Sequence, residues 1–289
     1  MTPPADLYRS ALDELLTLSH RIGRAGDLAI LAEGNTSVRL PSSGVSAGRF
    51  LVKASGHRLA DLDPDGVVCC EMAPLLAAVE ADDVLSEEEV EALLRSVIVP
   101  AHGTPAGTAS PRLPSAGPAP RPEASSPSSG GTKPSVEAFF HAVLLARPSV
   151  AAVAHAHPED VLAVMCSPLA DDFAARRRFP DEVVCCGPTS MRLPYIDPGL
   201  ALARELHRRL PSDRPPPPVI LLDNHGVICP AATAGLAWSA LAMTAKAARV
   251  YTRSAALSAG RPPTALPDAE VHRIHHRLDE AHRRKQLER

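Results

Sequence analysis

The sequence has few aromatic residues and lacks any long apolar segment. Phe, Trp and Tyr make up 3% of its 289 residues. No apolar run approaches the roughly 20 residues that a membrane-spanning helix needs, and the first residues lack the basic-then-apolar order of a secretory signal. A formal net charge of −3 provides no basic surface for nucleic acid or an anionic membrane. We therefore expect a cytoplasmic protein that binds neither nucleic acid nor membrane.

Recognisable cysteine and nucleotide motifs are also missing. None of the six cysteines forms a Cys-x-x-Cys pair, and most lie in apolar stretches. We interpret them as reduced thiols that act as small apolar core residues in a reducing compartment. Neither a P-loop nor a dinucleotide-binding glycine fingerprint occurs, so the sequence does not support ATP or NAD binding.

One stretch of unusual composition interrupts the chain. Residues 100–132 consist mainly of Pro, Gly, Ser, Thr and Ala, with almost no large apolar side chain. Such a stretch cannot bury enough apolar surface to offset the entropy lost on ordering. We predict a disordered insertion within a single domain spanning residues 1–289, whose core covers residues 8–257.

Strand-like and helical patterns alternate on both sides of this insertion. Apolar residues recur at helical spacing over 5–25, and an alanine-rich helix is expected over 233–259. Apolar runs at 149–154 and 219–222 predict strands, as does the run Val-Val-Cys-Cys at 183–186. This alternation predicts a three-layer α/β/α sandwich. A charged C-terminal helix is expected over residues 262–289.

Three histidines follow two of the predicted strands. His155 and His157 are separated by one residue, so in an extended chain their side chains point to the same side. His225 follows the strand at 219–222 and can approach from a neighbouring turn. Three imidazoles that leave one position open are typical of a catalytic divalent-metal site, and zinc is favoured. The alternative is that these are ordinary histidines beside turns.

A carboxylate candidate lies upstream of the histidines. Ser135 is a natural N-cap, which would put Glu137 in the first turn of a helix. Glu137 could act as a general acid/base beside a metal, or it could simply complement the helix dipole. His141, one turn later, is interpreted as a structural hydrogen-bonding partner.

Small polar residues occur at several predicted turns. They could hold an anion through backbone N–H groups and hydroxyls, with Lys53 adding positive charge nearby, although ordinary turn chemistry also explains them. These residues are Gly34, Asn35, Ser55, Gly56 and Ser135.

Together these phrases resemble the class II aldolase/adducin family. The similarity covers roughly residues 8–257 without the insertion. The matching phrases, in order, are Gly-Asn-Thr-Ser at 34–37, Lys-Ala-Ser-Gly at 53–56, Pro-Ser-Val-Glu at 134–137 with His141, His-Ala-His-Pro at 155–158, Pro-Tyr at 194–195 with Gly199, and Asn-His-Gly at 224–226.

The resemblance implies an α/β/α sandwich that forms a homotetramer with active sites between subunits. It implies a divalent metal, usually zinc, held by His155, His157 and His225, with Glu137 as the catalytic acid/base. Tyr195 would reach in from a neighbouring subunit to protonate the leaving aldehyde. The small polar residues named above would line the site for the substrate's phosphate group.

The implied activity is that of a lyase (aldolase) which cleaves a C–C bond of a ketose phosphate, or a related hydroxy-ketone, through a metal-stabilised enediolate. Epimerisation, decarboxylation and dehydration are reachable at the same site, and a non-catalytic, adducin-like binding module is the alternative from another class. Val136 stands where the sugar-phosphate aldolases often carry a second serine. One hydroxyl of the expected phosphate site is therefore missing.

Overall fold

The computed structural model describes residues 5–41, 48–81, 83–99, 132–211 and 213–277. The predicted insertion at 100–132 lies, apart from residue 132, outside the described residues, and so do residues 278–289. In the described part of the chain no helix combines the length and apolarity needed to cross a bilayer.

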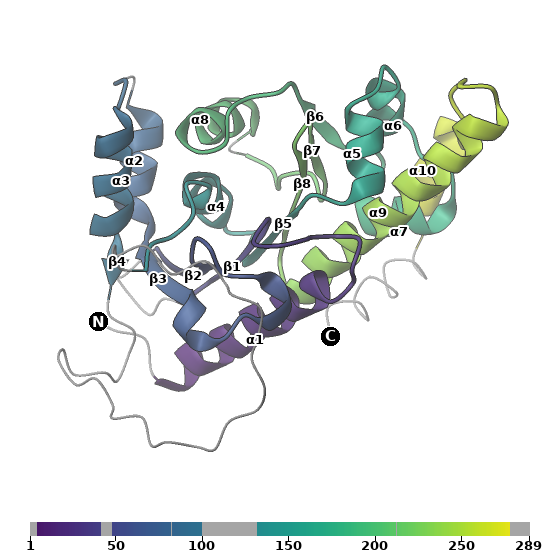
Figure 1. Ribbon diagram of the computed structural model, residues 1–289. Helices are drawn as coiled ribbons and strands as arrows, with labels where there is room; N and C mark the ends of the chain where they lie inside the picture. The colour runs from purple at the N-terminus through teal and green to yellow at the C-terminus, as the bar shows by residue number, and fades with distance from the viewer. Residues whose placement is uncertain (1–4, 42–47, 82, 100–131, 212, 278–289) are drawn as a thin grey trace, which may run out of the picture.

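An eight-stranded sheet forms the centre of the fold (Figure 1). All neighbouring strands are antiparallel except β6 and β7, which are parallel. In spatial order the strands are β4 (Ile98–Val99), β3 (Val67–Glu71), β2 (Arg49–Lys53), β1 (Asn35–Arg39), β5 (Ala152–Ala156), β8 (Gly226–Ala231), β7 (Ile220–Leu222) and β6 (Met191–Leu193).

Helices cover both faces of the sheet, which confirms the predicted three-layer sandwich (Figure 1). One face packs against α2 (Met72–Glu80), α3 (Glu87–Ser96), α4 (Ala138–Leu145) and α8 (Leu200–Arg209). The other carries α1 (Ala5–Gly23), α5 (Glu159–Met165), α6 (Ala170–Ala175), α7 (Pro180–Cys186) and α9 (Ala234–Leu257). The helix α10 (Asp268–His275) packs against α7. Two short 3-10 helices in the described residues span Leu59–Asp61 and Pro64–Gly66.

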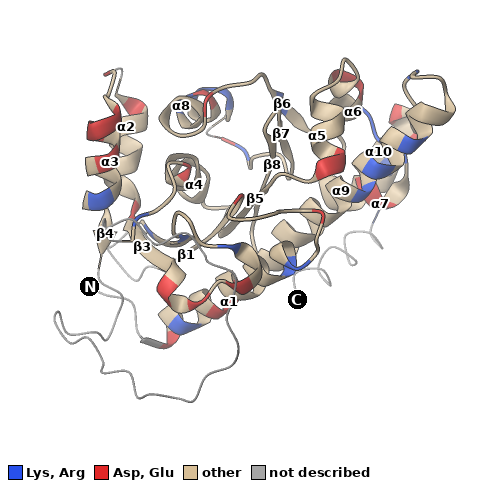
Figure 2. Cartoon of the chain, in the orientation of Figure 1, with Lys and Arg blue, Asp and Glu red and all other residues tan. Residues whose placement is uncertain are grey.

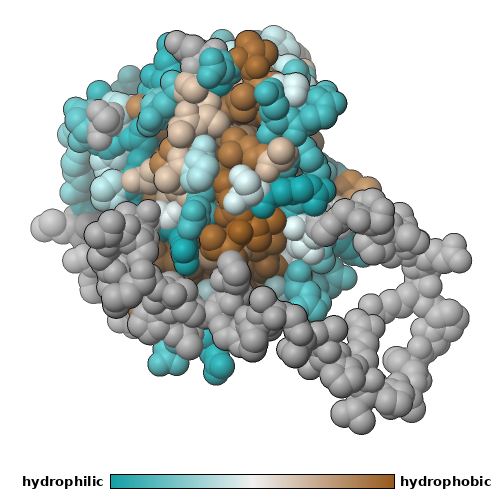
Figure 3. All heavy atoms as spheres, turned by 90° about the vertical axis from the view of Figure 1, so that its left-hand side faces the viewer, coloured by the Kyte–Doolittle hydropathy of each residue, from teal (hydrophilic) through white to brown (hydrophobic). Residues whose placement is uncertain are grey.

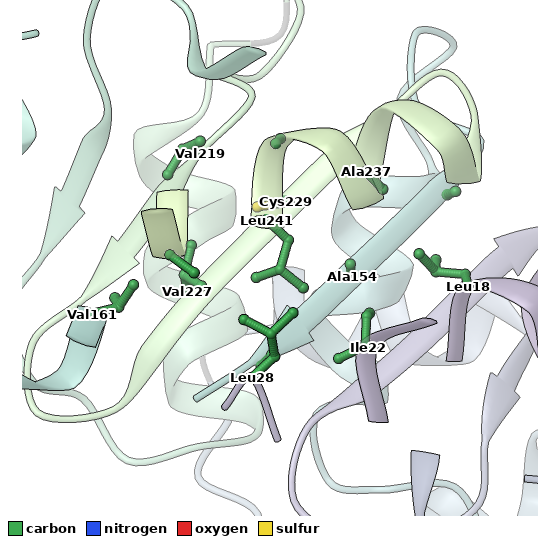
Figure 4. Packing of buried hydrophobic residues seen from close by; sticks show 14 of the residues in the cluster. Leu18, Ile22, Leu28, Ala154, Val161, Val219, Val227, Cys229, Ala237 and Leu241 are labelled. Carbon is green, nitrogen blue, oxygen red and sulfur yellow. The ribbon is translucent and has the colours of Figure 1, made fainter. Parts of the chain in front are cut away.

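Two apolar cores lie above and below the sheet because successive strand residues point to opposite faces. In β5, Ala152, Ala154 and Ala156 face the α1 and α9 side, whereas Val153 faces α4. The small alanines let the long helix α9 approach the sheet closely, where Leu241 lies between Val227 and Ala154 (Figure 4).

Charged residues lie mainly on the outer helices, and the central strands β5, β7 and β8 contain none (Figure 2). On the side that carries α2 and α3, apolar residues reach the surface as a strip between hydrophilic ones (Figure 3). The partly buried side chains of Leu76, Val90 and Leu93 belong to these two helices and pack against the core.

The predicted strand at 183–186 is wrong, because these residues form the end of helix α7. Pro180 occupies its first turn, and Asp181 and Glu182 complement its N-terminal dipole. Gly187 follows with φ of +73°, a conformation suited to a helix end. The buried Arg177 donates to the carbonyls of Cys186 and Gly187, so it caps the C-terminal end.

Two predicted helix starts are also corrected. The helix expected from Ser135 begins at Ala138, with Glu137 as its N-cap residue and Ser135 in the preceding turn. The C-terminal helix does not begin at residue 262: Pro267 is the N-cap residue, and α10 runs over Asp268–His275. Val271 and Ile274 bury its inner face against α7.

Candidate metal centre

The central strand β5 positions the first histidine. Its residue His155 pairs with Asn35 of β1 on one side and with Ile228 of β8 on the other. The side chain of His155 is fully buried on the α4 side of the sheet, next to the ring of Phe140. His157, two residues after His155, directly follows the last residue of β5 and is half-buried.

The third histidine comes from the tight turn between β7 and β8. Leu222 pairs with Gly226, so the three residues between them must reverse the chain. Asn224 adopts a left-handed conformation with φ of +55°, and the carbonyl of Leu222 accepts a hydrogen bond from the backbone N–H of His225. This turn directs His225 toward the end of β5.

The three imidazole rings form a nearly equilateral triangle. The ring centroids are 4.8 Å apart for His155 and His157, and His225 lies 5.0 Å from each of them. One nitrogen of each ring lies within 4.8 Å of the corresponding nitrogens of the other two. The Nε2 atoms of His155 and His157 are 2.9 Å apart. The predicted convergence of the three side chains is therefore present.

Contacts behind the rings orient two of them. Nδ1 of His155 donates to the carbonyl of Val227 at 3.0 Å, which leaves the lone pair on Nε2. Nδ1 of His157 lies 3.5 Å from Oε2 of Glu33. Carboxylates and carbonyls in this position fix the tautomer and orientation of metal-binding histidines. Glu33 was not among the predicted site residues, because its only sequence signal is its place two residues before β1.

Glu137 reaches the same point from the start of α4. Its Oε1 lies 3.2 Å from Nε2 of His155 and 3.2 Å from Nε2 of His225, without hydrogen-bond geometry to any described residue. Its other oxygen, Oε2, accepts a hydrogen bond from Nδ2 of Asn35 at 2.5 Å. The carboxylate is therefore held through one oxygen, and the second faces the imidazoles.

Burial and the surrounding charges shift the pKa values in opposite directions. Burial by itself raises the pKa of Glu137, but His155 and His225 outweigh it and hold that pKa well below the usual value. Burial alone lowers the pKa of His155, yet the Glu137 carboxylate raises it above its usual range. His157 is different, because burial and the two other imidazoles lower its pKa to about 3.

This donor set fits a divalent metal ion. Three imidazole nitrogens that converge on one point are ligands that Zn²⁺ and related ions prefer, and two of the rings here, His155 and His157, have polar contacts on their far nitrogens. The buried Oε1 of Glu137 lacks a hydrogen bond, and a cation among the imidazoles would compensate its charge. The chain thus contains a three-histidine site suited to a divalent cation.

The predicted anion-binding residues come from three places: the start of β1, the turn after β2 and the turn before α4. Ser55 is exposed after β2, and its backbone N–H donates to the carbonyl of Lys133, two residues before Ser135. Lys53 donates to the carbonyls of Ala32 and His57, so it ties the loop before Gly34 to the loop after Gly56. The side chain of Asn35, by contrast, is directed to Glu137 and is buried.

Tyr195 does not join the histidine cluster within this chain. Its side chain is 56% exposed, and its hydroxyl donates to Oδ1 of Asp197 at 2.8 Å. That hydrogen bond and the charge of Asp197 raise the pKa of the phenol. The segment from Tyr195 to Gly199 nonetheless passes close to the start of α4, because Gly199 lies against Val136, the residue before Glu137.

The fold is an α/β/α sandwich, and its three-histidine site is suited to a divalent metal. Comparison with known families shows to which protein family this domain belongs. Residues 13–252 match the family model described as Class II Aldolase and Adducin N-terminal domain. The chain belongs to this family. The match spans both sides of the insertion, and it confirms the resemblance that the sequence motifs indicated.

Solved structures share the fold at low sequence identity. The N-terminal class II aldolase domain of a conserved protein from Thermoplasma acidophilum is 24% identical (TM-score 0.60, covering 84% of this chain and 93% of that one). An L-fuculose 1-phosphate aldolase from Glaciozyma antarctica is 14% identical (TM-score 0.59, 100% and 92%). A sugar-phosphate aldolase from Thermotoga maritima is 17% identical (TM-score 0.58, 88% and 98%). A comparison with curated proteins finds no match.

We predict that Gly226→Ala disrupts the turn that carries His225. Gly226 has φ of +152°, and an added Cβ would lie 2.5 Å from the carbonyl oxygen of Ala156 and 2.8 Å from the His157 ring. We expect the free energy of unfolding in urea to fall by about 2–4 kcal/mol. Gly260→Ala is the control, because Gly260 also has a positive φ but no atom near the added methyl group. Equal losses in the two variants would contradict this account.

We also predict a pH-dependent contribution from Lys53. Burial lowers the pKa of Lys53 from 10.5 to about 8 in the folded protein. Between these values the unfolded chain binds more protons, so the stability of wild type relative to Lys53→Met must rise with pH. We expect a rise of roughly 2–3 kcal/mol from pH 8 to 10.5, measured by urea unfolding of both proteins. If the difference in free energy of unfolding between wild type and Lys53→Met does not change with pH, the lowered pKa of Lys53 is contradicted.

Proposed function

We propose that the protein is a metal-dependent carbon–carbon lyase of the aldolase type. Its substrate would be a ketose phosphate or a related hydroxy-ketone. The observation that carries this proposal is the oxygen of Glu137 that is buried against the three imidazoles without a hydrogen bond. A carboxylate beside a metal centre is suited to moving a proton at a carbon next to a carbonyl group.

The three histidines would hold the metal through Nε2. Bound there, a divalent ion supplies Lewis acidity, which stabilises negative charge on the carbonyl and hydroxyl oxygens of the substrate. The contacts from Val227 and Glu33 to the far nitrogens keep His155 and His157 oriented for this purpose. We propose zinc as the metal.

Glu137 would transfer the proton at the nucleophilic carbon of the substrate. Asn35 occupies Oε2, so Oε1 is the oxygen available to accept and return the proton. Burial excludes competing water around this carboxylate. Because its pKa lies well below the usual value, Glu137 is ionised at neutral pH. In the condensation direction it would accept the proton from the nucleophilic carbon, and in the cleavage direction it would take up a proton and deliver it to that carbon of the enediolate.

The substrate's phosphate group would bind on the loops at the start of α4. Ser55 and Ser135 offer hydroxyls, while Gly34, Asn35 and Gly56 complete the proposed subsite, and the positive charge of Lys53 lies between the two loops. Tyr195 would act from a neighbouring subunit of a homotetramer. Asp197 raises its pKa, which keeps the phenol protonated in the free protein. On cleavage Tyr195 would relay the proton that the substrate's hydroxyl group loses as it becomes the aldehyde carbonyl.

The metal itself gives the first test. We expect purified, untagged protein to contain about one divalent ion per chain, measured by mass spectrometry, and His155→Ala to lose it. His272→Ala is the control, since His272 is exposed on α10 and should leave the metal content unchanged. Absence of metal in wild type, even after it is added, would refute the lyase proposal and favour a binding module.

The carboxylate gives the second test. We expect Glu137→Gln, with metal content and fold intact, to lower kcat by ~10²-fold or more on a ketose 1-phosphate cleaved by wild type. The substrate panel includes L-fuculose 1-phosphate, and product analysis separates C–C cleavage from epimerisation, decarboxylation and dehydration. The exposed Glu80→Gln serves as the matched control. Full activity of Glu137→Gln would overturn the assigned role.

A further inference from the structure

A row of buried polar side chains connects β1 to α4 and ends at Glu137. Asn35 and Ser37 alternate with Thr36 and Val38 along β1, so both point toward α4. Oγ of Ser37 lies 2.6 Å from Nδ1 of His141, and Nε2 of that ring contacts Oδ1 of Asn35. Nδ2 of Asn35 then donates to Oε2 of Glu137.

Only one direction of hydrogen bonding satisfies the whole row. The side-chain nitrogen of Asn35 can only donate, and the Glu137 oxygen accepts it. Oδ1 of Asn35 can only accept, so Nε2 of His141 must carry the hydrogen. Nδ1 of that ring is then an acceptor, and the hydroxyl of Ser37 donates to it. Every donor therefore points toward the carboxylate.

His141 is held in a single state that suits this direction. Its side chain is fully buried within α4, stacked on Phe140 with ring centroids 4.5 Å apart. Burial lowers its pKa to about 3, so the ring stays neutral despite the nearby Glu137 carboxylate. A rotated Asn35 amide would direct Oδ1 at the carboxylate and leave Nε2–H of His141 facing a donor, and both arrangements are unfavourable.

We propose that His141 is a positioning residue for Glu137. With Ser37 it fixes the orientation of the Asn35 amide, which holds Oε2 and leaves Oε1 as the oxygen that faces the imidazoles. This inference rests on the proposed role of Glu137. It extends that role by explaining why one particular oxygen of the carboxylate takes part in proton transfer, and it does not require His141 to touch the substrate.

The test compares two replacements of His141. His141→Phe keeps the ring volume but removes both hydrogen bonds, whereas His141→Gln places an amide N–H near the position of Nε2. We expect crystals of metal-free His141→Phe to lose the contact between Asn35 and Glu137, and those of His141→Gln to keep it. On the ketose 1-phosphate cleaved in the panel, kcat should fall roughly 10–100-fold in the Phe variant. KM and metal content should change little, and Gln should restore most of kcat.

A matched pair on β1 provides a second measurement that keeps His141 in place. Ser37→Ala removes the hydroxyl that fixes the ring, whereas Thr36→Val removes a hydroxyl bonded to Ser19 at 2.6 Å on the opposite face of the strand. Both changes delete one buried hydrogen bond. We expect only Ser37→Ala to lower kcat, by roughly threefold or more.

The possible results separate this inference from the proposed function. If Glu137→Gln is inactive but His141→Phe retains wild-type kcat and the contact between Asn35 and Glu137, the positioning role is refuted and the lyase proposal stands. If Glu137→Gln is fully active, the proposed function fails. Equal effects of Ser37→Ala and Thr36→Val on kcat would show a structural role only, and that also overturns the inference.

Discussion

The antiparallel pairing of β5 with both β1 and β8 is the constraint on which the site depends. Because side chains alternate along the strand, this pairing sends His155 to the α4 face, and His157 comes after it at the same spacing, while three alanines face α1 and α9. The same register sets Asn35 directly opposite His155 and brings β8, with the turn before it, alongside. A shift of one residue would move an imidazole into an apolar core. The geometry of the metal centre is thus a consequence of strand register.

Electrostatics explains why so many polar groups can be buried together at this position. Burying a carboxylate without a compensating charge or hydrogen bond costs folding free energy, and so does packing three imidazoles around one point. Each offsets the other here, because Glu137 lies between two histidines and receives a hydrogen bond from Asn35 on its far oxygen. The carbonyl of Val227 accepts a hydrogen bond from the far nitrogen of His155, and the carboxylate of Glu33 lies 3.5 Å from the far nitrogen of His157. The site is organised by the protein alone, before any ligand is considered.

Local patterns in the sequence were enough to predict the sandwich and the approach of the three histidines. His155 and His157 share a strand face through period-2 spacing, and His225 follows a strong apolar run into a turn. Partners that meet only through tertiary pairing were not predictable in this way: Asn35 and Glu137 are 102 residues apart in the chain, and Ser37 and His141 are 104 apart. The run at 183–186 was misassigned because four apolar residues fit a strand or a buried helix equally well. The helix signals lay outside that window, in Pro180 and Gly187.

The central claim is that three imidazoles and no other protein nitrogen or sulfur ligand converge on one divalent ion. X-ray absorption spectroscopy of the metal-loaded protein, recorded at the edge of the bound metal, measures this most directly. The account predicts scattering from three imidazole rings, with oxygen as the remaining atoms bound to the metal, and no sulfur at about 2.3 Å. A signal for fewer than three imidazoles, or for a thiolate from one of the six cysteines, would contradict it.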